Sequence, residues 1–396
     1  MRGHRVISIE NRKDAERFLK EIGSDEMGIK LMIPKAVFRA VKIHDIPSRT
    51  ANIIKQEMLS KGGEAAVKRD TVGGQGQTDV LLLGTLKQYH MLIDKLKMQP
   101  FGLRRLADEL YQVLMSMETD QGNEINLSPN NLMELKSKTL VMGILNVTPD
   151  SFSDGGRYAD SVRAAERICE MVDEGADIID IGGFSTRPGA APVEIEEETR
   201  RVLSVLKALG GKCPVPISVD TFREPVARAA LEQGASVIND EGGLKVDPAM
   251  AGLAARAGCP VIIMHSRLGG DYHDLIAEIL SDLRESIMIG MEAGIDEKNI
   301  IIDPGIGFGK TVDENLMMLK CLNEFRVLGR PILIGASRKS FIGKVLDTPP
   351  EDRLEGSLAA AVVGVLRGAS IIRAHDVKAT RRAVDVANAI VRGQLG

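Results

Sequence analysis

The sequence predicts an α/β protein in which a (β/α)8 TIM-type barrel follows a smaller N-terminal α/β domain. From residue 139 onward, a short β-branched apolar run followed by a helical pattern occurs eight times. Residues 139–396 number 258, close to the roughly 250 typical of such a barrel. Nearly every apolar run ends in a polar residue, and the carboxyl ends of the strands carry the active sites of this fold.

The eight expected strands have apolar residues on both faces, as parallel strands covered by helices require. They lie at 140–147, 177–183, 215–221, 236–240, 260–265, 299–305, 331–337 and 370–376. The pattern at 161–175 predicts a helix that ends at Gly175 and has one stripe made of Val162, Ala165, Ile168 and Val172. Doubly wound sheets share this alternation. Eight complete units, with no break where a strand order would reverse, favour the closed barrel.

The first 120 residues predict a small α/β domain whose role the sequence leaves unknown. Strands are expected at 5–10, 28–33, 36–46 and 78–85, and helices at 11–23, 48–63, 86–100 and 103–118. Residues 121–138 are polar, Asn-rich and unperiodic, which predicts a linker before the barrel at 139–396.

Composition narrows the classes of partner and the compartment. Hydrophobic residues make up 44% and charged residues 27%, as in globular proteins, and the net charge of −4 gives no reason to expect a nucleic acid or membrane partner. The N-terminus lacks the apolar core of a signal peptide. The cysteines form no C-x-x-C pair or disulfide framework, which predicts reduced thiols and a cytoplasmic protein: Cys169, Cys213, Cys259 and Cys321.

The polar residues that end the strands should converge on one rim of the barrel. They are Asn146, Ser185 with Thr186 and Arg187, Asp220, Asn239, His265, Asp303, Ser337 with Lys339, and Arg373 with His375. Taken singly, an Asp or Asn at a strand end is often only a helix cap or turn former. Packing does not require so many ionisable groups at one rim, so together they predict a functional site.

The rim residues form two chemical sets. Asp220, Asn239 and Asp303 offer hydrogen-bond acceptors, which suits a planar heterocycle rich in N–H groups, and Lys339 could donate to its carbonyl. The second set is suited to an anion such as a diphosphate with Mg2+, which takes oxygen ligands and is often shared with substrate phosphates. That set comprises Asn146, Arg187, Arg373 and His375. The rim has no H-x-H, E-x-x-H or Cys/His cluster, so zinc is not expected.

Seven segments, in order along the whole barrel, resemble dihydropteroate synthases of the pterin-binding barrel family. They are MGILNVTPDSFSDGG (142–156), DIIDIGGFSTRPGA (177–190), ISVDT (217–221), IND (238–240), IDPGIGFGK (302–310), GASRKSFIG (335–343) and IIRAHDV (371–377). The resemblance implies condensation of 6-hydroxymethyl-7,8-dihydropterin diphosphate with p-aminobenzoate, which yields 7,8-dihydropteroate and diphosphate in folate biosynthesis. It also implies a homodimer.

The resemblance assigns roles position by position. The pterin-binding residues would be Asp220, Asn239, Asp303, Lys339, Arg373, Met264, Phe308 and Gly335. Two loops and the start of a helix would bind p-aminobenzoate through Phe152, Asp154, Thr186, Arg187, Pro188 and Ser340. Diphosphate would contact Asn146, Arg187, Arg373 and His375, with Asn146 as the Mg2+ ligand.

Two departures from the family pattern stand out. Phe184 replaces the Glu that many members have, and the segment after His265 is shorter than usual. Two other functions remain as alternatives: a non-catalytic pterin-binding paralogue, and a methyltetrahydrofolate:corrinoid methyltransferase, whose barrel also binds a pterin. The diphosphate residues favour the synthase over both.

Overall fold

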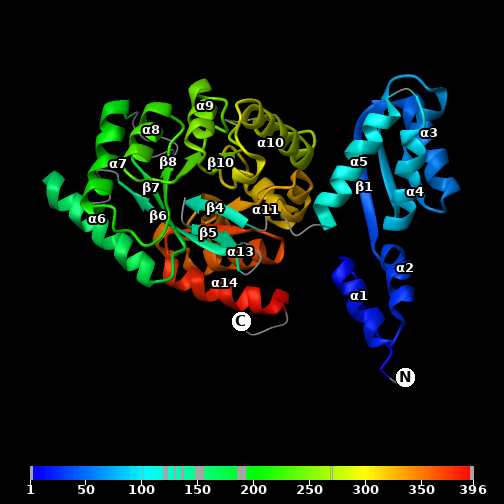
Figure 1. Cartoon of the computed structure of the whole chain (residues 1–396), viewed down its shortest axis with the longest axis horizontal. Helices are drawn as coiled ribbons and strands as arrows, with labels where there is room; N and C mark the ends of the chain where they lie inside the picture. Colours follow the sequence, from blue (N-terminus) through cyan, green and yellow to red (C-terminus); the bar gives the residue numbers. More distant parts are fainter. Residues whose placement is uncertain are drawn as a thin grey trace. The chain divides into compact units, whose positions relative to one another are not determined.

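The computed structural model describes residues 3–100, 102–118, 124–128, 131–134, 138–147, 156–184, 193–267, 269 and 271–392 (Figure 1). The chain divides into two compact units, Met1–Thr119 and Asp120–Gly396. Each unit has its own apolar core, so each is described separately.

The second unit is a parallel eight-stranded barrel. Its strands are β6 (Leu140–Asn146), β7 (Ile178–Gly182), β8 (Ile217–Asp220), β9 (Val237–Asp240), β10 (Val261–Met264), β11 (Ile300–Asp303), β12 (Leu333–Ile334) and β13 (Ile371–Ala374). Their order is β11-β10-β9-β8-β7-β6-β13-β12. A parallel bridge between Ile302 and Ile332 joins the two ends of this order, so the sheet closes and the predicted fold class is confirmed.

Helices cover the outside of the barrel, as Figure 1 shows. They are α6 (Gly156–Asp173), α7 (Ile195–Leu209), α8 (Glu224–Glu232), α9 (Pro248–Ala257), α10 (Leu275–Glu292), α11 (Val312–Lys320), α12 (Ser340–Leu346), α13 (Leu354–Leu366) and α14 (Val377–Arg392). On α6 the predicted stripe is partly wrong. Ala164, Ile168 and Met171 are the fully buried residues, whereas Val162 is exposed, because the helix is rotated by about one residue from the expected orientation.

The inside of the barrel changes from apolar to polar within one step along the strands. An apolar cluster fills the barrel toward the amino ends of the strands: Leu140, Met142, Ile178, Val237, Ile262, Ile301, Leu333 and Ile371. Side chains two residues apart on a strand share a face. The next inward positions are therefore Ile144, Asp180, Asn239, Met264, Asp303, Gly335 and Arg373, of which four are polar. The apolar cluster thus forms a layer beneath these polar side chains, and the region that they border at the carboxyl ends of the strands is called the chamber below.

The first unit is a three-stranded antiparallel sheet with helices. It comprises α1 (Arg12–Glu21), α2 (Glu26–Ala36), β1 (Phe38–Pro47), α3 (Ser48–Ser60), β2 (Glu64–Val67), η1 (Arg69–Gly73), β3 (Gln77–Thr85), α4 (Leu86–Lys97) and α5 (Leu103–Glu118), in the sheet order β1-β3-β2. The four predicted helices and the strands at 36–46 and 78–85 are confirmed.

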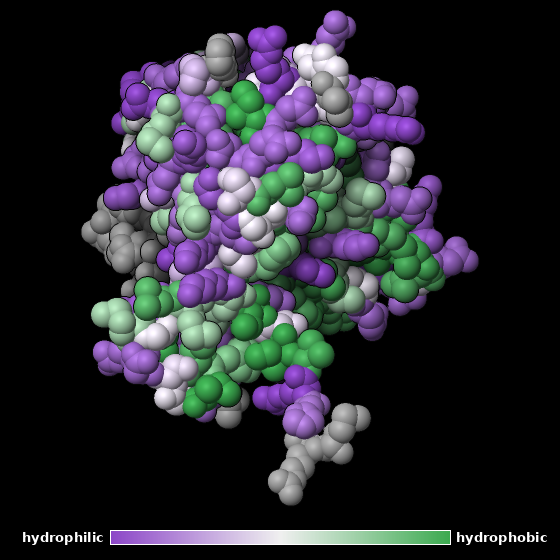
Figure 2. All heavy atoms as spheres, turned by 90° about the vertical axis from the view of Figure 1, so that its right-hand side faces the viewer, coloured by the Kyte–Doolittle hydropathy of each residue, from purple (hydrophilic) through white to green (hydrophobic). Residues whose placement is uncertain are grey.

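Two strand predictions in this unit are wrong. Residues 5–10 form no strand, and residues 28–33 lie in α2. Asp25 caps α2 by accepting the Gly28 N–H at 2.9 Å, and Ile29 is buried. The outer side of α2 is also apolar, with Met27 and Leu31 exposed, and Figure 2 shows apolar groups gathered in the lower part of its view, where Figure 1 places α1 and α2. An apolar run with both faces occupied does not distinguish a helix from a strand.

The predicted linker at 121–138 contains regular structure. Within it, β4 (Glu124–Ser128) pairs antiparallel with β5 (Asn131–Glu134). Strand β4 contacts the short helix η3 (Glu297–Asn299), which immediately precedes barrel strand β11. This hairpin belongs to the barrel unit, so the segment is not a plain linker.

Candidate active site

Three predicted pterin-binding residues lie together on the inner wall of the barrel. Asp220 ends β8, Asn239 lies on the neighbouring β9, and Asp303 ends β11. Asp220 pairs in register with Asn239, and all three side chains are buried. Burial, followed by the nearby Glu241, raises the pKa of Asp220, and burial raises the pKa of Asp303. These acceptors therefore lie in a region with little access to water.

Arg373 is the central cation of this wall. Its Nε donates to Asp180 Oδ2 at 2.6 Å, and its Nη2 donates to Asp220 Oδ2 at 2.5 Å. Burial alone would lower the pKa of Arg373, but Asp180 and Asp220 outweigh that effect and raise it. Asn239 Nδ2 also donates to Asp180 Oδ2, at 3.0 Å. Arg373 is therefore linked to Asp220 directly and to Asn239 through Asp180. Its predicted contact with diphosphate stays a prediction.

Lys339 approaches the chamber from the start of α12. Its Nζ donates to the Ile306 carbonyl at 2.6 Å and lies 3.8 Å from the centre of the Phe308 ring. Burial lowers the pKa of Lys339 to about 8. Gly307 has a φ of +84°, and a Cβ there would lie 2.2 Å from Lys339 Cδ. The glycine at position 307 therefore leaves the space that the Lys339 side chain occupies.

A half-buried lysine holds the loop that carries Phe308. Lys310 Nζ donates to the carbonyls of Gly305 at 2.9 Å and Phe308 at 3.1 Å, and lies 3.1 Å from His265 Nδ1. The other ring nitrogen of His265 lies 3.2 Å from Asp282 Oδ2. Burial lowers the pKa of Lys310 to about 8. Burial, followed by the charge of Lys310, lowers the pKa of His265 to about 4. Neutral His265 can thus accept from Lys310 and donate to Asp282.

The other predicted residues of the described chain border the same chamber or its rim. Met264 and Gly335 are buried at inward positions, and Asn146 is half-buried at the end of β6, opposite Gly182 in register. His375 Nδ1 lies 3.1 Å from Ser337 Oγ, and Ser340 is exposed at the start of α12. The remaining predicted residues fall outside the described ones: Phe152, Asp154, Thr186, Arg187 and Pro188.

Phe184 makes an aromatic contact where many family members would place a carboxylate. Its ring meets that of Phe222 edge-on, with centroids 5.3 Å apart, and the Arg223 guanidinium lies within 6 Å of both rings. Arg223 Nη1 also donates to the buried Glu198 at 2.8 Å. The structure gives position 184 a packing role on the outer side of the rim.

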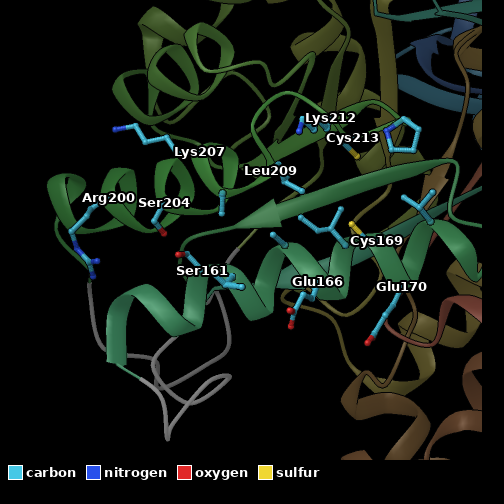
Figure 3. Close-up of a pocket in the computed structure, with 16 residues that line it drawn as sticks. Ser161, Glu166, Cys169, Glu170, Arg200, Ser204, Lys207, Leu209, Lys212 and Cys213 are labelled. Carbon is cyan, nitrogen blue, oxygen red and sulfur yellow. The ribbon is translucent and has the colours of Figure 1, made fainter.

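A separate groove of about 1080 Å3 lies on the outside of the barrel between α6 and α7 (Figure 3). Helix α6 contributes Ser161, Glu166, Cys169 and Glu170, and α7 contributes Arg200, Ser204, Lys207 and Leu209. No described residue that lines this groove lies at the carboxyl end of a strand. It is therefore separate from the polar chamber.

The model of the family "Pterin binding enzyme" matches residues 142–375, which include every inward polar residue described above. The chain belongs to this family of pterin-binding enzymes. It is 51% identical over 272 residues to the dihydropteroate synthase of Bacillus subtilis, an alignment that covers 69% of this chain and 95% of that protein. A solved structure of Xanthomonas albilineans dihydropteroate synthase with 4-aminobenzoic acid is 42% identical, with a TM-score of 0.65, and covers 68% of this chain and 98% of that one.

The N-terminal unit also occurs in a relative. A probable bifunctional folylpolyglutamate synthase/dihydropteroate synthase of Halobacterium salinarum is 37% identical over 395 residues. The alignment covers 98% of this chain and 47% of that protein. The pterin-binding family match therefore accounts for the barrel alone, whereas this relative extends over both units.

Sequence reasoning missed two residues of the chamber, Asp180 and Lys310. Asp180 lies in the expected strand 177–183, two residues after the inward Ile178, so strand periodicity alone would have placed it inside. For Lys310 the sequence offers only its place after a glycine-rich turn, and its contact with His265 depends on the fold.

Proposed function

We propose that this pterin-binding enzyme is a dihydropteroate synthase that joins 6-hydroxymethyl-7,8-dihydropterin diphosphate to p-aminobenzoate in folate biosynthesis. The observation that carries the proposal is the buried acceptor set Asp220, Asn239 and Asp303, with the charge of Lys339 acting on Asp303. Asp220 Oδ1 is buried and has no hydrogen-bond partner among the described residues. A buried acceptor of this kind is stabilised when a ligand N–H reaches it, and a pterin presents several.

The chemistry requires positioning and stabilisation of an anion. When the amine attacks the pterin CH2, a C–N bond forms, the C–O bond to diphosphate breaks, and the leaving group carries the electron pair. The amine nitrogen then loses a proton to the diphosphate or to water. An aryl amine is already nucleophilic, so the main task is to hold the leaving anion and orient the two substrates. Arg187, Arg373 and His375 are the cationic or donor groups that we assign to the diphosphate. His375 lies on the rim beside Ser337.

Magnesium is the proposed metal. The Asn146 amide oxygen at the end of β6 fits a hard cation whose other ligands are phosphate oxygens and water. Among the described residues there is no group of three or more His, Cys, Asp or Glu side chains placed to hold a metal. A bound Mg2+ would neutralise charge on the departing diphosphate.

The second substrate would bind above the pterin. We assign it to Ser340 and to the two loops predicted from the sequence, which contain Phe152, Asp154, Thr186, Arg187 and Pro188. Ser340 is exposed at the start of α12 and follows Lys339 directly, which supports a place for the amine next to the pterin.

We propose a cytoplasmic homodimer. Exposed apolar side chains on the neighbouring helices α13 and α14 support a subunit interface there: Val363, Leu366, Val386 and Ile390. No helix in the described part of the chain is both long and apolar enough to span a lipid bilayer. The N-terminal unit would take no part in the chemistry, since every residue assigned to the reaction lies beyond position 141.

The test is diphosphate release from the pterin diphosphate by the full chain. We expect release only when p-aminobenzoate and Mg2+ are both present. Pterin binding without release would indicate a non-catalytic pterin-binding protein. Methyl transfer from methyltetrahydrofolate to a corrinoid would indicate the methyltransferase instead.

A further inference from the structure

We propose that Asp180 is a positioning residue that orients Asn239 and Arg373 and thereby determines which edge of a heterocycle the chamber accepts. The proposal rests on the pterin-binding function given above. It deepens that function because Asp180 belongs to neither of the two residue sets inferred from the rim. Asp180 lies at the middle of β7 and is fully buried.

One oxygen of Asp180 receives two site side chains. Its Oδ2 accepts Asn239 Nδ2 at 3.0 Å and Arg373 Nε at 2.6 Å. The three residues come from β7, β9 and β13, so a single carboxylate connects three strands of the barrel. The ion pair with Arg373 makes this carboxylate an acceptor only.

This contact decides how the Asn239 amide is oriented. A side-chain amide has a donor end and an acceptor end of nearly equal shape, and only its partners distinguish the two orientations. Because Asp180 can only accept, the amide must turn its NH2 toward Asp180. The amide oxygen is then the end offered to a ligand, so position 239 would select an N–H donor over a ring acceptor.

The same contact fixes the plane of Arg373. Its Nε and Nη2 are held by two carboxylates on the adjacent strands β7 and β8, Asp180 and Asp220. Two hydrogen bonds from one rigid guanidinium set both its position and its tilt. Loss of Asp180 would leave Arg373 attached to Asp220 alone and free to rotate.

The second oxygen of Asp180 could accept a hydrogen bond from a ligand. Its Oδ1 is buried and has no hydrogen-bond partner among the described residues, as is also true of Asp220 Oδ1. Buried polar atoms in native proteins are almost always satisfied, by protein, water or ligand. Two such oxygens beside Arg373 indicate that this polar wall is built to receive donors.

Asp177 provides a matched control in the same segment of chain. It is a buried carboxylate three residues earlier, where it accepts from Val141 N–H at 2.9 Å and Arg381 Nη1 at 3.1 Å and pairs with Lys138. It immediately precedes β7, at the opposite end of the barrel from the chamber. Asp177→Asn therefore removes a buried charge next to β7 without touching the site.

The experiment compares full-length Asp180→Asn, Asn239→Ala, their double variant and Asp177→Asn. Calorimetry measures the affinity for 6-hydroxymethylpterin, and steady-state kinetics measure KM for each substrate. We expect Asp180→Asn to weaken pterin binding at least tenfold and to raise the KM for p-aminobenzoate less than threefold. In the Asn239→Ala background, the same change should cost less than it does in the wild-type chain, because the orientation of the amide no longer matters and only the effect through Arg373 remains. Asp177→Asn should lower the melting temperature and leave pterin affinity unchanged.

The outcomes separate this inference from the proposed function. Failure of the wild-type chain to bind the pterin would overturn the function itself. A wild-type protein that binds, together with a folded Asp180→Asn protein of unchanged affinity, would overturn the positioning role alone. Additive losses in the double variant would do the same. If Asp180→Asn does not fold, Asp180→Glu keeps the charge but moves it by one methylene, and it should show the same selective loss of pterin affinity.

Discussion

Protonation of His265 is predicted to destabilise the barrel below neutral pH. The ring is buried, and its two nitrogens contact Lys310 at 3.1 Å and Asp282 at 3.2 Å. Tyr272 and Arg267 lie on the same side, with the Tyr272 ring 6.3 Å from the imidazole and Arg267 over Tyr272. A proton on Nδ1 would face the Lys310 ammonium and break the contact that fixes the Gly305–Lys310 loop.

The magnitude follows from the two pKa values of this histidine. An unfolded histidine has a pKa of about 6.5, whereas burial and Lys310 lower the pKa of His265 in the folded chain to about 4. Between these values the unfolded state binds more protons, so stability rises with pH there. The contribution is fully present above pH 6.5 and is lost as the pH falls toward 4. A difference of about 2.5 in pKa corresponds to about 3 kcal/mol.

Two measurements test this prediction. An NMR titration of the histidine ring protons should give one resonance with a midpoint near pH 4, absent in His265→Gln. Urea unfolding at pH 7.5 and pH 4.5 should show that the barrel of the wild-type chain loses about 2–3 kcal/mol more than that of His265→Gln. Other carboxylates titrate in both proteins, so the variant removes their contribution. A midpoint at pH 6 or above for His265 would refute the reasoning.

Three further predictions concern binding and catalysis. Asp303→Ala, or the same change at Asp220, should weaken pterin binding by about 1–3 kcal/mol in calorimetry, since a ligand N–H loses its buried acceptor; unchanged affinity in a folded variant would contradict the assignment. A chain that starts at Asp120 keeps the β4–β5 hairpin. It should retain turnover within about tenfold, which corresponds to about 1.4 kcal/mol in the activation free energy. A folded but inactive protein would show that the N-terminal unit completes the site. p-Aminobenzoate should bind the free enzyme poorly and much better with pterin, diphosphate and Mg2+ present, and Arg187→Ala should weaken only that second binding; equal affinity without diphosphate would rule this order out.

The sequence by itself determined the barrel and much of its inner wall. Eight alternating segments predicted the strands. Asp220 and Asp303 end their strands and Asn239 is one residue from the end of its own, and their inward direction was readable because side-chain direction alternates strictly along a strand. The same periodicity predicts Asp180, which was overlooked only because it lies inside the strand and not at its end. Local periodicity thus carries most of the information on which residues face the chamber.

Sequence was less informative where local patterns fit two structures. Residues 28–33 are apolar on both faces, so only the cap at Asp25 and burial against the first unit's core decide that they form a helix. The β4–β5 hairpin lies in a polar segment without alternation, and its strands are evident only from their pairing with each other. Both errors arise because the deciding interactions join residues that the local pattern does not relate.

Only the tertiary structure decided which side chains bind one another inside the chamber. Arg373 lies 193 residues from Asp180 and 153 from Asp220, and Lys310 lies 45 from His265. Each of these contacts depends on the order of the strands in the sheet, because that order brings chain segments far apart in sequence within hydrogen-bond range. The low solvent access of that enclosed space also lowers the pKa of Lys310 and of His265. Sequence periodicity gives the direction of a side chain. Its partner depends on the order of the strands in the sheet, and its charge depends on burial and on the charged groups around it.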